Sequence, residues 1–286
     1  MKICVAGLGL IGGSLCMSLK RAGYKVDGWN RSPKPLKYAL ENGIIEDFAQ
    51  NFCGYDIVFV ALPPQATLDF INGTAFKDGA LVSDICGVKG FIEKAVFSKP
   101  RNFSYVGCHP MAGKEVSGIE NACAELFDGA NMVITHSAHT NPFALQVLRS
   151  LTKAMGFGRL IECSAEVHDR KIAYTSQLAH IVSNAYVKDN EIESCFGFTG
   201  GSFQDMTRIA GVDEAVWSAL YLENAENVSG KIASLITSLA EIKSAVDSGN
   251  AEKLRAVLKS GRVLFEESKL YNNSAEITVT VLNGAN

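Results

Sequence analysis

The sequence predicts an α/β protein with a Rossmann-type, doubly wound parallel sheet at the N-terminus and an all-α C-terminal domain. Two observations support this prediction. Over about the first 160 residues, short apolar runs alternate with helix-like segments, which is typical of parallel strands joined by crossover helices. After Cys163, long segments carry apolar residues at three- and four-residue spacing, as in helices that bury one face.

The first domain is expected to span residues 1–163. Its continuous apolar run Asp56–Leu62 is followed by Pro63-Pro64, as expected of a buried parallel strand. Helix-like stretches are expected at Leu10–Ala22 and Pro35–Glu41. The other strands are expected at Lys2–Ala6, Lys25–Trp29, Ala80–Ile85, Phe103–Gly107, Asn131–Thr135 and Gly158–Cys163.

The second domain is expected to span residues 164–286 and to be helical. Helical periodicity covers Glu166–Lys188, Val216–Val246 and Ala251–Leu270, and a strand-like run returns only at Glu276–Leu282. Broad apolar faces such as Ile232–Leu239 need a partner surface. We expect a homodimer formed through this domain, although packing of helices within one chain would leave the same pattern.

Composition and charge exclude several classes of protein. Hydrophobic residues make up 47% of the 286 residues and charged residues 20%, as in globular proteins. A net charge of −3 does not favour a nucleic-acid partner. The eight cysteines form no C-x-x-C pair, so neither a metal site nor a disulfide framework is expected. No apolar stretch has membrane-spanning length, and glycines interrupt the N-terminal run, so we expect a cytoplasmic protein.

A glycine turn follows the first strand and begins the first helix. Its glycines are Gly7, Gly9 and Gly12, the G-x-G-x-x-G pattern of dinucleotide-binding turns. The first glycine permits the tight turn, the second lets a pyrophosphate approach the backbone, and the third allows the helix to pack closely on the strand. The helix N-terminus at Leu10 and Ile11 then presents free N–H groups. Leu62 and Pro63, at the end of another strand, are also expected to contact the cofactor.

The end of the second strand favours NADP over NAD, with NAD as the alternative. An acid that bonds the NAD ribose is expected there, but the strand ends in Trp29-Asn30-Arg31-Ser32. Arg31 can pair with a 2′-phosphate, and Asn30 and Ser32 can add hydrogen bonds. Asp27, the nearest acid, lies within the strand, three residues too early.

His109 is the candidate catalytic residue. It follows the expected strand Phe103–Gly107 at its carboxyl end, where open α/β sheets bind their ligands. An imidazole near a nicotinamide is suited to take a proton from a hydroxyl as a hydride leaves the same carbon. By position alone, a loop histidine with no catalytic role fits equally well.

The helical domain contains a second cluster of polar residues, which includes His168-Asp169, His180 and Arg208. Arg208 is expected in the second turn of a helix after Gly200-Gly201. Its neighbours Ile209-Ala210 favour partial burial, and a buried guanidinium needs an anionic partner. That partner is either Asp205, three residues earlier, or a substrate carboxylate.

Taken together, these segments make the chain resemble the prephenate dehydrogenase family, which includes arogenate dehydrogenases. The matching pieces occur in the same order and at the same spacing as in the family. They are GLGLIGGSL at 7–15, HPMAGKEVSG at 109–118, HDRKIAYTSQLAH at 168–180 and GGSFQDMTRIA at 200–210. The resemblance implies oxidative decarboxylation of prephenate or arogenate to 4-hydroxyphenylpyruvate or tyrosine, with hydride transfer to a nicotinamide cofactor.

The resemblance also implies roles for individual residues. His109 would accept the proton of the ring 4-hydroxyl, Arg208 would hold a substrate carboxylate, and His180 would line the substrate pocket. His168 and Asp169 would shape the start of a helix and the cleft between the domains. Trp217 would lie near the pocket.

Three positions depart from the family pattern. Gly87 stands where many members have a serine that is thought to orient the histidine and the cofactor. Here a backbone group, a water molecule or Cys86 must substitute, or activity is lower. Gln177 replaces the first histidine of an S-H-L-P-H run, and Lys114 stands where serine is frequent. These changes affect substrate preference more than the type of reaction.

Two alternatives belong to other functional classes. The β-hydroxyacid dehydrogenases also join a Rossmann domain to a helical one, but they use a lysine after a glycine-rich segment, and none follows Gly197–Gly201 here. A non-catalytic NADP sensor would signal through the helical domain and would not need both His109 and Arg208.

Overall fold

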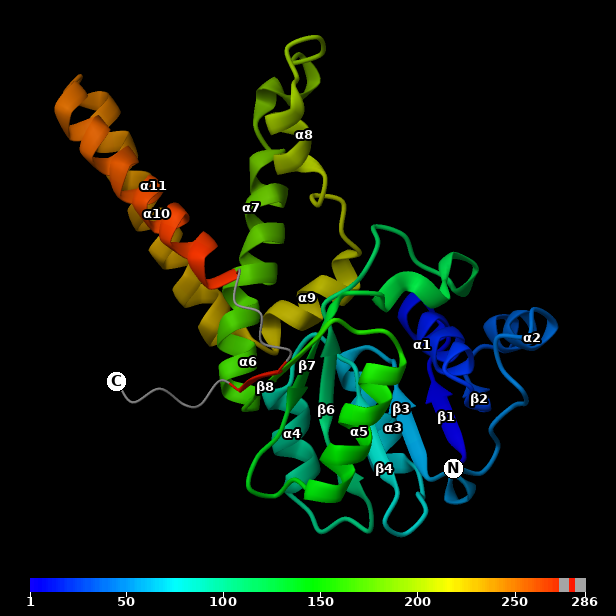
Figure 1. Ribbon diagram of the computed structural model, residues 1–286. Helices are drawn as coiled ribbons and strands as arrows, with labels where there is room; N and C mark the ends of the chain where they lie inside the picture. Colours follow the sequence, from blue (N-terminus) through cyan, green and yellow to red (C-terminus); the bar gives the residue numbers. More distant parts are fainter. Residues whose placement is uncertain (273–277, 281–286) are drawn as a thin grey trace.

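The computed structural model describes residues 1–272 and 278–280. Its N-terminal part is built on a five-stranded parallel sheet in the order β2-β1-β3-β4-β5 (Figure 1). This order reverses direction beside β1, as in the predicted Rossmann-type fold. The strands are β1 (Ile3–Ala6), β2 (Val26–Trp29), β3 (Ile57–Val60), β4 (Leu81–Asp84) and β5 (Ser104–Tyr105).

Helices cover both faces of this sheet. Because successive strand residues point to opposite faces, each face has its own apolar cluster. Ile3 and Val5 of β1 pack in one cluster with the apolar faces of α1 (Leu10–Arg21) and α5 (Pro142–Ala154). Cys4, between them, points to the other cluster, which contains residues of α3 (Pro64–Gly73) and α4 (Gly90–Phe97). The remaining helix of this part, α2 (Pro33–Glu41), lies beside β2.

The chain changes sheets between Tyr105 and Gly107, which corrects one predicted strand. The expected strand Phe103–Gly107 is instead β5 followed by β6 (Gly107–Pro110), so His109 lies within a strand rather than after one. A side chain at Gly107 would lie 2.4 Å from the Thr135 hydroxyl oxygen, so only glycine fits this crossing. β6 also runs antiparallel to its neighbour β7 (Asn131–Thr135), although an all-parallel sheet was expected.

The second sheet has the order β6-β7-β8-β9. β8 (Arg159–Cys163) is parallel to β7, and β9 (Thr278–Thr280) is parallel to β8. The strand-like run expected at Glu276–Leu282 therefore includes β9, and its other residues lie outside the described part of the chain. β9 therefore extends the second sheet beside β8 and does not belong to the helical part.

The helical part begins at α6 (Ala165–Ile172), where the Ser164 side chain accepts a hydrogen bond from Val167 N. A turn of π-helix (η4, Ala173–Gln177) separates α6 from α7 (Leu178–Tyr186), so the expected helix Glu166–Lys188 is interrupted. Such π-turns occur frequently at functional sites. The remaining helices are α8 (Gly201–Thr207), α9 (Glu214–Leu222), α10 (Ala225–Asp247) and α11 (Ala251–Asn272).

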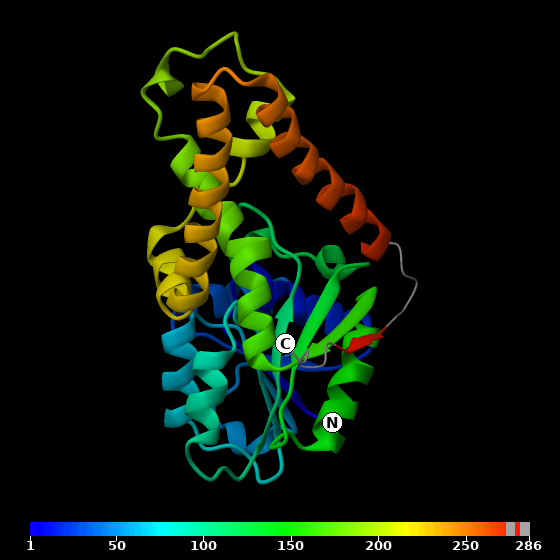
Figure 2. The ribbon, with the colours of Figure 1, turned by 90° about the vertical axis from the view of Figure 1, so that its left-hand side faces the viewer.

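The helices form two arms that project from the sheets (Figures 1 and 2). One arm contains α7 and α8, the other is the helical hairpin of α10 and α11, and α9 lies between their bases. Large apolar side chains remain exposed on both arms, including Tyr186, Phe196, Phe198, Ile236, Leu239, Leu264 and Phe265. In the described part of the chain, no helix is long and apolar enough to cross a membrane.

Candidate active site

The glycine turn has the geometry that a dinucleotide pyrophosphate requires. Gly7 has a positive φ of 99°, and a Cβ there would lie 2.2 Å from the Ala61 carbonyl oxygen. A Cβ at Gly12 would lie 1.8 Å from the Gly7 carbonyl oxygen. Only glycine therefore lets α1 pack this closely against the turn. A Cβ at Gly9 would meet nothing within 4 Å. This open side is where a phosphate can reach the backbone at the start of α1, near Leu10 and Ile11.

The residues after β2 are arranged around this turn. Asn30 accepts a hydrogen bond from Leu8 N through Oδ1 at 3.0 Å, so it holds the glycine turn in place. Arg31 and Ser32 are exposed, and Ser32 caps α2 without a side-chain hydrogen bond. Asp27 accepts a hydrogen bond from the Tyr55 hydroxyl at 2.8 Å within the sheet, away from the position of a ribose-binding acid.

Leu62 and Pro63 follow β3, which lies on the other side of β1 from β2 and its Asn30. A Cβ at Gly7 would approach the Leu62 side chain to 2.9 Å. Pro63 follows directly and is exposed as the N-cap of α3. Leu62 and Pro63, the open side of Gly9 and the exposed Arg31 all lie at the carboxyl edge of the parallel sheet. An extended dinucleotide can bind along this edge.

The His109 side chain lies at the same edge, between the two parts of the protein. A Cβ at Gly87, three residues after β4, would lie 3.7 Å from His109 Nε2 and 3.4 Å from Leu220 of α9. The Nε2 edge of the ring therefore faces the end of β4 and the underside of α9. Gly87 leaves space there that a larger side chain would fill.

The other ring nitrogen of His109 contacts His168, a residue of α6. His109 Nδ1 lies 2.9 Å from His168 Nε2, and His168 Nδ1 lies 2.7 Å from Asp169 Oδ1. His168 is 2% exposed, so it is a buried neighbour of the catalytic candidate rather than only a residue that shapes a helix start. The sequence did not indicate this contact, which joins residues 59 positions apart.

The surroundings of His109 favour its neutral form. Burial lowers the pKa of the His109 imidazole well below its usual value, and His168 and the Lys89 ammonium lower it further. Lys89 is itself fully buried in an ion pair with Asp84. Burial also lowers the pKa of His168, although its hydrogen bond to Asp169 acts in the opposite direction. A neutral imidazole is the form that can accept a proton.

Cys86 does not take the place of the missing serine. Its thiol is buried and bonds the Leu62 carbonyl oxygen at 3.1 Å and the Thr67 hydroxyl at 3.2 Å. Burial raises the pKa of this thiol to about 12. The group that contacts His109 is instead the His168 imidazole.

His180 of α7 and Trp217 of α9 pack against each other in the helical part. The two rings are tilted against each other with centroids 3.8 Å apart. His180 Nδ1 lies 3.0 Å from the Ile209 carbonyl oxygen, which leaves Nε2 for other partners. Burial lowers the pKa of His180, and the nearby Arg208 lowers it further.

Arg208 is more exposed than expected. It follows the last residue of α8 as its C-cap, and 63% of its side chain is exposed, so the predicted partial burial is wrong. Its ionic partner is Glu115, from the loop after β6, and not Asp205. Glu115 is a site residue that the sequence reasoning missed, and it belongs to the HPMAGKEVSG segment that follows His109.

The other two departures have different surroundings. Gln177 is buried and structural: its amide bonds the Leu220 carbonyl oxygen and the Asn224 side chain. Lys114 lies near Cys123, with Nζ 3.4 Å from the sulfur.

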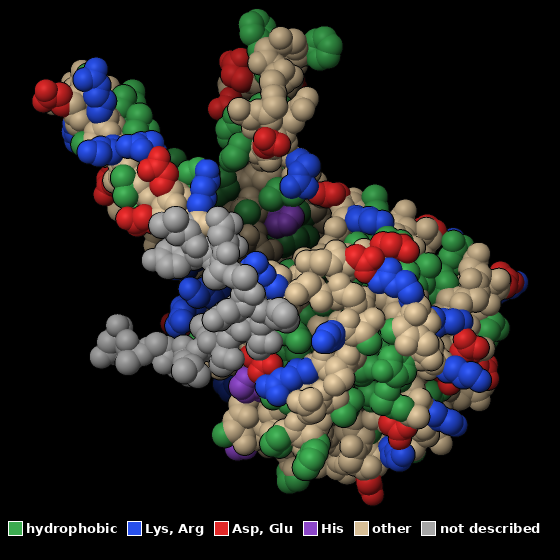
Figure 3. Space-filling model, in the orientation of Figure 1, with side chains coloured by type: hydrophobic (Ala, Val, Ile, Leu, Met, Phe, Trp, Pro, Cys, Tyr) green, Lys and Arg blue, Asp and Glu red, His purple; other side chains and the backbone are tan. Residues whose placement is uncertain are grey.

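The space-filling view shows a hollow between the helical arms and the sheets, with a histidine side chain visible inside it (Figure 3).

Comparison with known proteins identifies the chain. Residues 15–161 match the family model described as prephenate dehydrogenase, nucleotide-binding domain, and residues 164–260 match the dimerization domain of the same enzyme. The chain belongs to the prephenate dehydrogenase family. The prephenate dehydrogenase of Bacillus subtilis is 30% identical over 275 residues, which cover 91% of this chain and 74% of that protein.

Solved structures of the family have the same fold. The arogenate dehydrogenase of Synechocystis is 25% identical, with a TM-score of 0.80 over 94% of this chain and 100% of that one. The prephenate dehydrogenase of A. aeolicus, in complex with hydroxyphenyl propionate and NAD+, is 27% identical, with a TM-score of 0.81 over 93% of this chain and 98% of that one. The chain is therefore an oxidoreductase of this family with a nicotinamide-binding domain.

Proposed function

We propose that this prephenate dehydrogenase family member oxidatively decarboxylates prephenate or arogenate, a step in tyrosine biosynthesis. The products are 4-hydroxyphenylpyruvate or tyrosine, carbon dioxide and reduced nicotinamide. The observation that supports this reaction best is the position of His109. Its Nε2 faces Gly87, which follows β4 at the carboxyl edge of the parallel sheet, and the helical part supplies His180 from α7 and Arg208 at the end of α8.

His109 acts as the general base. Its Nε2 takes the proton of the ring 4-hydroxyl while a hydride leaves the same carbon, which becomes a carbonyl. Oxidised nicotinamide, when bound, accepts that hydride. The bond to the ring carboxylate then breaks, its electron pair makes the ring aromatic, and the resulting phenolate takes the proton back from His109. The lowered pKa of His109 keeps Nε2 free to begin this cycle.

The helical part holds the substrate side chain and carboxylates. The Arg208 guanidinium can bind a carboxylate through two parallel hydrogen bonds. Its present partner Glu115 is half-exposed, so a substrate carboxylate competes with it for the guanidinium. His180 presents Nε2 to the same space, and Trp217 supports the His180 ring.

One assay tests the reaction and both open choices. Purified protein is incubated with prephenate or arogenate and with NAD or NADP, and reduced nicotinamide is measured by absorbance. We expect turnover of at least one substrate with at least one cofactor. A protein that binds NADP but turns over neither substrate at any pH would instead be the non-catalytic sensor.

We propose that the chain prefers NADP. Arg31 is exposed at the end of β2, and the nearest acid, Asp27, is occupied by Tyr55 inside the sheet. A 2′-phosphate beside Arg31 gains a charge-assisted contact that NAD does not offer.

Replacement of Arg31 by alanine is expected to raise the KM for NADP by about 10- to 100-fold, because a charge-assisted pair is worth about 1.5–3 kcal/mol. The KM for NAD should change less than threefold. Initial rates with each cofactor give both values, and Lys34→Ala, another exposed basic residue nearby, is the matched control. A higher kcat/KM for NAD in the wild type, with unchanged NADP kinetics in Arg31→Ala, would contradict this preference.

We propose that the helical part, residues 164–272, binds substrate and forms a homodimer, and that residues 1–163 bind the cofactor. The exposed apolar side chains of the two helical arms, such as Leu239 and Phe265, support a second copy as the partner. Light scattering should give twice the mass of one chain. Leu239→Glu, on α10, should shift the protein towards monomers, whereas the exposed Phe143→Glu on α5 should not. A monomeric wild type at micromolar concentration would exclude this interface.

A further inference from the structure

The buried contacts behind His109 form a line of three side chains. Asp169 contacts His168, and His168 contacts His109, each through a single pair of atoms within 3 Å. His168 and Asp169 are adjacent on α6, so one helix supplies both. The line runs from the start of α4, behind the site, to the ring that faces the cleft.

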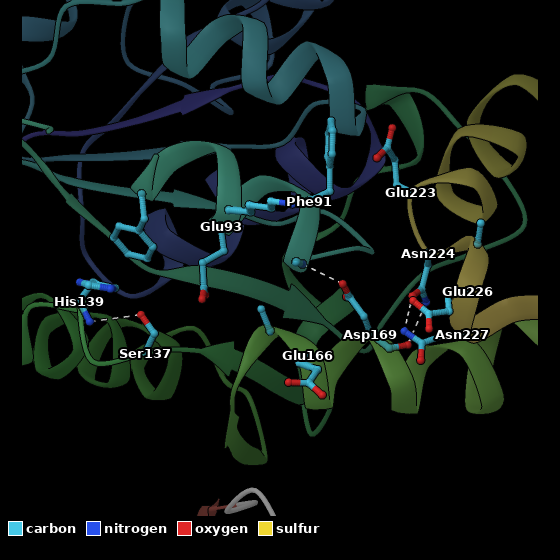
Figure 4. Close-up of a pocket in the computed structure, with 15 residues that line it drawn as sticks. Phe91, Glu93, Ser137, His139, Glu166, Asp169, Glu223, Asn224, Glu226 and Asn227 are labelled. Carbon is cyan, nitrogen blue, oxygen red and sulfur yellow. Dashed lines mark hydrogen bonds between the residues drawn. The ribbon is translucent and has the colours of Figure 1, made fainter. Parts of the chain in front are cut away.

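The protein backbone fixes the direction of the hydrogen bonds at one end of this line. Asp169 Oδ1 accepts a hydrogen bond from Lys89 N at 2.9 Å, and Oδ2 accepts one from Gly90 N at 2.8 Å. The second carboxylate oxygen therefore faces the first turn of α4, and Asn224 holds the Asp169 backbone carbonyl from the opposite side (Figure 4). A carboxylate in this position only accepts hydrogen bonds, so His168 Nδ1 must carry the hydrogen.

The remaining directions follow from the first. A neutral His168 with its hydrogen on Nδ1 has a bare Nε2, which can only accept. His109 Nδ1 must therefore donate to it, and the hydrogen of a neutral His109 is placed on Nδ1. His109 Nε2, which faces Gly87 and the cleft, is then the nitrogen with the free electron pair.

We propose that His168 and Asp169 are positioning residues that fix the tautomer and the ring orientation of His109 from its Nδ1 side, whereas Gly87 lies on the Nε2 side. This inference rests on the proposed function, because it assigns the reactive nitrogen of the same base. It differs from the role expected from the sequence, in which these two residues only shape a helix start and the cleft.

The charges around the line are compatible with this arrangement. Lys89 and Asp84 are paired and buried beneath His109 and His168, and the Lys89 ammonium disfavours a second positive charge on either imidazole. On the outer side of Asp169, an open pocket is lined by Glu93, Lys94, Glu166, Glu223 and Glu226.

Two substitutions of His168 distinguish a role in orienting His109 from a role in packing alone. His168→Met fills the space but accepts no hydrogen bond of comparable strength. We expect kcat to fall by about 10- to 100-fold, the loss that is usual when a metal-bound histidine loses the group that orients it. The KM values for substrate and cofactor should stay within about twofold. His168→Gln, whose side-chain oxygen can replace Nε2, should keep kcat within about threefold of the wild type. His139→Met, at an exposed histidine, is the control and should leave kcat unchanged.

The tautomer can be measured directly by nitrogen NMR of the ring of His109 in the full-length wild-type protein. We expect the Nδ1–H form in the wild type and in His168→Gln, and a mixture of both forms in His168→Met. An Nε2–H form in the wild type would overturn the inference, and so would normal kcat in a folded His168→Met protein or equal losses in the Met and Gln variants. The wild-type spectrum tests it even if a variant does not fold or if no substrate is turned over.

Discussion

Replacement of His109 by asparagine is expected to lower kcat by about 10²–10⁴, the usual contribution of a general base. Asparagine is close in size to histidine and keeps a polar side chain, but it cannot take up a proton near neutral pH. The substrate and cofactor sites contain other residues, so both KM values should stay within a few-fold of the wild type. Steady-state kinetics with the preferred substrate and cofactor give these constants.

The pH profile gives the second part of this prediction. The pKa of His109 lies well below 6.5 in the folded protein, so the ring stays neutral and active as pH falls through that value. We therefore expect kcat/KM to remain level down to pH 6.5 and to fall only below it. Asparagine at position 109 should abolish this acidic limb. A variant with near-normal turnover, or a wild-type limb centred above pH 6.5, would contradict the assignment of His109 as the base.

The stability of the protein should depend on pH in the same direction. His109, His168 and His180 all have lowered pKa values in the folded state, so the unfolded chain binds more protons as pH falls below 6.5. The free energy of unfolding consequently decreases in that range. The base thus stays active under conditions where the fold begins to lose stability.

The sequence predicted the fold wherever the pattern is local. The glycine turn, the buried run at Asp56–Leu62 and the helical periodicity after Cys163 each depend on neighbours in the chain. The crossing at Val106–Gly107 does not. Its strand looks continuous in sequence, and the change of sheet depends on the absence of a side chain at Gly107, where a Cβ would collide with Thr135 and crowd Lys89. A direction reversal of this kind leaves no periodic signal.

The sequence predicted individual residues of the site but not the contacts between them. His109 and Arg208 were identified by residue type and position, but their immediate partners were not. His168 and Glu115 lie 59 and 93 positions away from the residues that they contact. Only the folded chain brings them together. The exposure of Arg208 also could not be inferred, because Ile209-Ala210 favour burial, whereas 63% of the Arg208 side chain is exposed at the end of α8.

Replacement of Arg208 by alanine is expected to raise the KM for the substrate by about 10- to 100-fold, with kcat within about threefold of the wild type. A guanidinium–carboxylate pair of this kind contributes about 1.5–3 kcal/mol, and its loss weakens the ground and transition states alike. Arg208→Lys keeps the charge but not the paired hydrogen bonds, so its KM should be intermediate.

The matched control is Arg262→Ala on α11, where the arginine is similarly exposed, at 59% of its side chain, and also pairs with a glutamate. Its kinetics should equal those of the wild type. Glu115→Gln removes the competitor for the Arg208 guanidinium without changing the size of the side chain, so it should leave the KM for substrate unchanged or lower it. Substrate titrations of all four variants give the values. An unchanged KM in Arg208→Ala would mean that Arg208 serves only as the partner of Glu115, and the substrate carboxylate would then have to be bound elsewhere in the cleft.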